Sequence, residues 1–129
     1  MALTDVPQER LLAAIQEGEE ASALELINLA SSRDASIRES VAARPDAPIS
    51  ALIVLAQDSK SKVRRALAAN SAVARAVSVQ GMLAADKDSD VVLALAINPA
   101  TPDETLRRLL DHGKKSVRNA AEERLTRYL

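Results

Sequence analysis

Apolar residues recur along this chain with the periodicity of a helix, in blocks separated by short polar links. After Pro48, Leu52 and Leu55 lie on one helix face. A polar link follows, and Val63 and Leu67 then lie four residues apart on a second face. The pattern predicts a unit made of a longer helix, a polar turn and a second helix of about two turns, closed by a loop rich in proline or asparagine.

This unit occurs four times. Each second helix carries a β-branched anchor residue, and the four anchors are Ile37, Val63, Val91 and Val117. The spacing between successive anchors is 26, 28 and 26 residues. Pro48 and Pro102 occupy corresponding loops, where proline suits the start of the next helix because its φ is fixed and it lacks a backbone donor.

Helices of this length are not stable alone, and a two-helix unit leaves apolar surface on both sides that only neighbouring units cover. We therefore expect a single all-α domain over residues 1–129, with about four two-helix repeats over residues 32–129 stacked into a short curved solenoid.

Repeat arrays need atypical ends. Residues 5–31 are expected to form two N-terminal capping helices broken near Gly18, and residues 115–129 a lengthened final helix that caps the C-terminal end. The residues expected to face inward from the N-terminal cap are Leu11, Leu12 and Ile15.

The repeated blocks read LASSRDASIRESVAARPDAP (29–48), LAQDSKSKVRRALAANSA (55–72) and LAADKDSDVVLALAINPATP (83–102). This pattern, over about 100 residues, resembles the HEAT-like α-solenoids and most closely the leucine-rich repeat variant family. The resemblance implies a right-handed superhelix in which α-helices alternate with short, often 3₁₀, helices; periodicity alone leaves the type of the short helices open. Some relatives hold a cysteine-bound iron–sulfur cluster, which this chain cannot, because it has no cysteine.

Composition narrows the chemistry further. Hydrophobic residues make up 47% of the chain, and Tyr128 is the only aromatic residue. The chain has one histidine and no cysteine, and the lack of cysteine excludes thiol catalysis and cysteine-ligated metals. Seventeen basic and eighteen acidic residues give no net attraction to nucleic acid or membranes. We expect no metal, no cofactor and no membrane span, and a cytoplasmic location, because no signal peptide is evident and the longest apolar run is Val91–Ile97.

Asp58 is followed by Arg64, and Asp86 lies at the position of Asp58 in the next unit, which suggests a ladder that ties adjacent units together. An arginine there would donate to a carboxylate or to carbonyls left open at helix ends. We favour this structural role over ligand binding. The ladder is expected to break where the pattern fails, at Ser32, Val92 and His112.

The segment Val91–Ile97 is apolar on every side. Either its neighbours bury it all round, which we favour, or Leu93 and Ile97 form an exposed patch for a partner. A β-strand is the local alternative, but the repeat register favours a helix.

Asp86, Asp88 and Asp90 alternate like the start of a calcium-binding loop, but its later glycine and glutamate are missing, so an acidic helix start with Asp90 as the N-cap is the better interpretation. His112 lies in a turn without a nucleophile near it in sequence, and Glu122 and Glu123 are adjacent and point apart. The sequence predicts no catalytic residues.

We expect a non-enzymatic protein-interaction module or scaffold that presents the second helices as a preformed concave surface. Its partner-facing residues, one from each unit, are Glu39, Arg65, Leu93 and Asn119. The alternative is a nucleic-acid-binding module that uses its basic residues, namely Lys62, Arg64, Arg65, Lys114, Lys115 and Arg118. The identity of the partner and the oligomeric state are left open.

Overall fold

The structure, a computed structural model, describes residues 22–127, which form helices joined by short turns, with no strand among them. The all-α class is therefore confirmed for this part of the chain. The helices are α2 (Ala23–Leu29), α3 (Ala35–Ala42), α4 (Ile49–Ala56), α5 (Ser61–Ala68), the 3₁₀ helix η2 (Ser71–Arg75), α6 (Val77–Ala84), α7 (Ser89–Ile97), α8 (Asp103–Leu109) and α9 (Lys115–Thr126).

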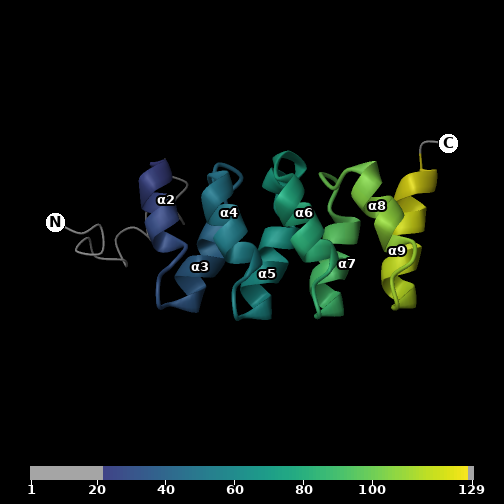
Figure 1. Cartoon of the computed structure of the whole chain (residues 1–129), viewed down its shortest axis with the longest axis horizontal. Helices are drawn as coiled ribbons and strands as arrows, with labels where there is room; N and C mark the ends of the chain where they lie inside the picture. The colour runs from purple at the N-terminus through teal and green to yellow at the C-terminus, as the bar shows by residue number, and fades with distance from the viewer. Residues whose placement is uncertain (1–21, 128–129) are drawn as a thin grey trace.

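The helices lie in two rows along the long axis of the molecule (Figure 1). The first row contains α2, α4, α6 and α8, and the second row contains α3, α5, α7 and α9. Successive helices are in contact within each row, and each first-row helix also packs on the second-row helix that follows it in sequence. Each helix pair thus covers the pair before it.

The four predicted anchors occupy the same place on the four helices of the second row. Ile37 is 3% exposed and Val63, Val91 and Val117 are fully buried. The matching leucines of the first row, also at most 2% exposed, are Leu29, Leu55, Leu83 and Leu109. Burial of each such side chain stabilises the fold by roughly 2 kcal/mol. Because these buried residues recur with the repeat, the repeat period of the sequence is also the period of the core.

The expected difference in helix length is wrong. α4 and α8 have eight and seven residues, whereas α5 and α7 have eight and nine. α4 is short because it begins only after Pro48 and ends before Asp58, whose side chain accepts the Lys60 N–H at 2.9 Å and forms the turn. None of the helices between residues 22 and 127 combines the length and apolar character needed to cross a bilayer.

The second-row helices are α-helices, so the 3₁₀ geometry implied by the family resemblance is wrong for them. Within residues 22–127 the 3₁₀ helix is η2, which lies in the loop before α6. This loop holds the two extra residues of the 28-residue spacing: Ala47 and Thr101 precede their helices by two positions, whereas Val73 precedes α6 by four.

The apolar segment 91–97 lies within α7, which excludes the strand alternative. The N-cap of α7 is Asp88 rather than the predicted Asp90: the Asp88 carboxylate accepts the Asp90 N–H at 2.9 Å. Asp34 caps α3 in the same way through the Ser36 N–H. The repeat register, which places Asp88 on Asp34, identifies the cap correctly.

Both ends of the chain were expected to hold caps. α9 is the longest described helix, with twelve residues, and it lies within the range 115–129 predicted for the C-terminal cap. Only α2 of the expected N-terminal cap is described. The predicted break near Gly18 and the inward-facing residues Leu11, Leu12 and Ile15 lie outside the described residues.

Candidate functional site

The predicted ladder is present and runs through the turns between the first-row and second-row helices. Arg38 on α3 donates from Nε and Nη2 to both carboxylate oxygens of Asp58, at 2.7 and 3.3 Å. Its Nη1 donates to the Ser32 carbonyl at 2.8 Å. One guanidinium therefore joins the turn before its own helix to the turn of the next unit.

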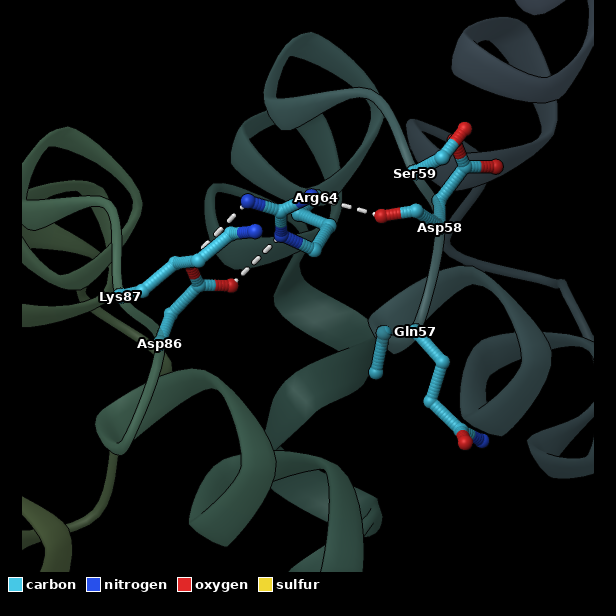
Figure 2. Close-up of a pocket in the computed structure, with 7 residues that line it drawn as sticks. Gln57, Asp58, Ser59, Arg64, Asp86 and Lys87 are labelled. Carbon is cyan, nitrogen blue, oxygen red and sulfur yellow. Dashed lines mark hydrogen bonds and ion pairs between the residues drawn. The ribbon is translucent and has the colours of Figure 1, made fainter.

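Arg64 repeats this arrangement one unit later. It contacts the Asp86 carboxylate at 2.7 and 3.2 Å and the Asp58 carbonyl at 2.6 Å. Figure 2 shows its guanidinium between the two turns. The side chains of Arg64 and Asp86 are only 8% and 6% exposed, so this is a buried, bidentate ion pair.

The residues that receive the arginines also shape their own turns. In all four turns this residue accepts, through its side chain, the backbone N–H two positions later, at 2.9 to 3.1 Å. The accepting residues are Ser32, Asp58, Asp86 and His112. The turn geometry therefore tolerates a hydroxyl, a carboxylate or an imidazole at this position.

The ladder breaks between the third and fourth units, as predicted. Val92, at the position of Arg38 and Arg64, is fully buried, and the facing residue is His112 instead of an aspartate. The breaks expected at Ser32 and His112 are only partial: their carbonyls accept from Arg38 and Arg118, at 2.8 Å in both cases. A backbone carbonyl is present whatever the side chain, so this half of the ladder does not need an acid.

The ladder holds its ions in their charged forms. Burial alone would raise the pKa of Asp58, but hydrogen bonds from Arg38 and the Lys60 N–H, with the charges of Arg38 and Arg64, hold that pKa below its ordinary value. The hydrogen bond to Asp86 is the main cause that raises the pKa of Arg64. Neither ion is poised to exchange a proton near neutral pH.

An open groove of about 440 Å³ lies over this part of the ladder, between the turns that contain Asp58 and Asp86. Its other walls are Ala56, Gln57, Ser59, Arg64 and Lys87. The polar groups of Arg64 and both aspartates form hydrogen bonds with each other and with the backbone of the turns. The groove is therefore a by-product of the stacking.

A second set of contacts between units was not predicted. The Asn70 amide donates to the carbonyls of Ala42 and Arg44, both at 2.8 Å, and Asn98 does the same to Ala68 and Asn70. One unit later, Arg124 donates to the Asn98 carbonyl at 2.6 Å. These side chains satisfy carbonyls left open at the end of the preceding second-row helix.

We call these contacts the clasp. The sequence did contain a signal for the clasp, because its residues, Asn70, Asn98 and Arg124, follow one another at spacings of 28 and 26 residues. An asparagine beside a proline or a serine is typical of a turn, so the sequence predicts its role in its own loop but not its contacts with the preceding unit. Among residues 22–127 no buried side-chain nitrogen or oxygen lacks a hydrogen-bond partner.

The four predicted partner-facing residues occupy one position on α3, α5, α7 and α9. Arg65 and Asn119 are exposed, and Glu39 and Leu93 are partly buried. The favoured burial of the whole segment 91–97 is wrong for Ile97, which is 60% exposed, while Leu93 packs partly against the core. Burial all round would need neighbours on every side of α7, and within residues 22–127 none covers the side that carries Ile97.

The six predicted phosphate-binding residues do not form one surface. Arg64 is buried against Asp86, and Arg118 donates to the His112 carbonyl. The remaining four, which are exposed, are Lys62, Arg65, Lys114 and Lys115. Two of them lie on α5 and two at the start of α9. α7 packs between these two helices, and Asp88 and Asp90 lie at its N-terminal end.

The acidic residues and the histidine discussed in the sequence analysis form structural contacts. Asp86 pairs with Arg64, Asp88 caps α7, and the His112 Nδ1 accepts the Lys114 N–H at 3.0 Å. Glu123 pairs with Arg127 on the surface at 3.7 Å. Residues 22–127 contain no group of three or more acidic or histidine side chains arranged to hold a metal ion.

No family model, no curated protein and no solved structure matches this chain.

Proposed function

We propose that this chain is a non-enzymatic protein-interaction module built as a short, right-handed α-solenoid of about four two-helix repeats, HEAT-like and similar to the leucine-rich repeat variant family. The two packed rows and the residues that join adjacent units support the solenoid. A surface fixed in this way loses little conformational entropy when a partner binds.

One observation carries the proposal: the four residues at one position of the second row differ in chemistry while the positions beneath them repeat. Their order along the row is Glu39, Arg65, Leu93 and Asn119, which is acidic, basic, aliphatic and amide. Packed helices lie about 8–10 Å apart, so the row spans about 25–30 Å. An extended partner segment of roughly eight residues covers that distance.

The proposed contacts define the partner segment. A basic residue would meet Glu39, an acidic residue would meet Arg65, and an apolar side chain would contact Leu93 and the exposed Ile97. Rim charges set orientation and association rate, and the apolar contact supplies most of the affinity.

Selection from a displayed random-peptide library tests this proposal. Enriched peptides should carry a basic, an acidic and an apolar residue in that order, and Arg65→Glu should weaken their binding about tenfold or more, as expected for reversal of one charge pair. Lys62→Glu is the matched control, because it reverses an exposed charge on the same helix outside the row. Failure to enrich any peptide, or equal loss in both variants, would refute the proposal.

A further inference from the structure

The outward surface of the first row has an unusual composition. Residues 22–127 contain eight large hydrophobic residues that are at least 36% exposed, and six of them lie on α2, α4 and α6. We call them the uncharged face; they are Leu24, Ile27, Ile49, Val54, Val77 and Met82. α4 and α6 contain no charged residue at all, although nothing in the described chain covers their outer sides.

The face changes character at α8, where four of seven residues are charged. Arg108 occupies the repeat position of Val54 and Met82, and Arg107 is its neighbour. Arg108 extends over α6, because its Nη1 lies 3.9 Å from where a β-carbon on Gly81 would be. Arg107 is exposed, and the ion pair of Arg108 with Glu104 is long, at 3.7 Å, and exposed, so both arginines can also contact the carboxylates of a partner.

The size of the face distinguishes between possible occupants. Three helices at about 8–10 Å spacing, each about 12 Å long, give a strip of roughly 300 Å². A stable interface with a second copy of the chain needs about 800 Å² from each partner. A single helix, about 10–12 Å wide and about 30 Å long at 20 residues, fits this strip.

We propose that the uncharged face binds one amphipathic helix of a partner protein, laid across α2, α4 and α6, with acidic residues at its C-terminal end beside Arg107 and Arg108. Apolar residues at helical spacing would cover Val54 and Met82. The carboxylates and the negative end of the helix dipole would both lie next to the two arginines. The site is independent of the second-row surface proposed above.

Two designed peptides of about 20 residues, labelled for fluorescence anisotropy, test the proposal with the full-length protein. Both carry the same leucine-rich apolar face, and they differ only in a C-terminal pair of glutamates or lysines. We expect the acidic-ended peptide to bind about tenfold more tightly, and Arg107→Glu with Arg108→Glu to invert this preference.

Val54→Glu with Met82→Glu should weaken both peptides about tenfold or more, because it places charge in the apolar contact. Both positions are exposed, so these variants should keep the wild-type circular dichroism spectrum. Lys62→Glu, which reverses an exposed charge on the other row outside both proposed surfaces, should leave peptide binding unchanged. Equal affinity for the two peptides, binding that survives Val54→Glu with Met82→Glu, or a dimer in sedimentation that Val54→Glu dissociates would each overturn the proposal.

Discussion

The Arg64–Asp86 pair should couple two adjacent units energetically. Because both side chains are more than 90% buried, removing either partner leaves a charge without its counter-ion, which typically costs about 3–5 kcal/mol. The chain provides its own replacement, since Val92 and His112 occupy the same two positions where the ladder breaks. We therefore expect Arg64→Val and Asp86→His each to destabilise strongly, and the double variant to cost about 2 kcal/mol less than their sum.

Urea unfolding followed by circular dichroism measures this cycle, because the chain has no tryptophan. With a slope of about 2 kcal/mol per molar urea, a 3 kcal/mol loss lowers the midpoint by about 1.5 M. Arg118→Val is the matched control, because Arg118 donates to a backbone carbonyl, that of His112, and its loss should therefore cost only about 1 kcal/mol. Additive effects of the two single changes would show that the pair does not connect the units.

Three further predictions concern the other polar contacts. Asn98→Ala should cost about 3 kcal/mol in urea unfolding, because it leaves the Ala68 and Asn70 carbonyls and the Ala100 N–H without their partner; an effect below 1 kcal/mol would contradict the clasp. Folding lowers the pKa of Asp58, so the ionised carboxylate stabilises the fold fully above its ordinary pKa of about 4, and this stabilisation is lost as the pH falls through the lowered pKa. Asp58→Asn should therefore reduce the loss of unfolding free energy at acid pH, and an unchanged loss would contradict this. Gln80→Leu should destabilise, since Gln80 bonds the Val73 carbonyl and the Thr105 hydroxyl, and adding Thr105→Val should recover part of the loss; no recovery in thermal melts would refute the pairing.

Much of the fold was predictable because the same contacts recur in every unit. The anchors Ile37, Val63, Val91 and Val117 share one burial environment, and a pattern sampled four times outweighs any single local preference. The ladder was predictable for the same reason, since an acid and an arginine recurred at the repeat period.

The remaining features depend on neighbours that spacing does not specify. Ile97 is apolar and exposed because no helix in the described part of the chain covers its side of α7, and a count of apolar residues cannot show which side is covered. Asn70 and Asn98 have a local role, accepting N–H groups in their own loops, which hides their contacts with the previous unit. Of the candidate site, the row that contains Arg65 was placed from sequence, whereas the uncharged face required knowledge of which side of α4 and α6 packs inward.

The 3₁₀ helix η2 shows where this molecule accepts added length. Its loop is two residues longer than its counterparts, yet Val73 within η2 is fully buried and Arg75 still donates to the Ala47 carbonyl of the previous loop at 2.6 Å. The turns closed by Arg38 and Arg64 have no such slack, because each guanidinium fixes two turns at once. We therefore expect a recognition sequence inserted between Arg75 and Val77 to leave the flanking repeats in register, because this connection already holds two additional residues without losing either contact.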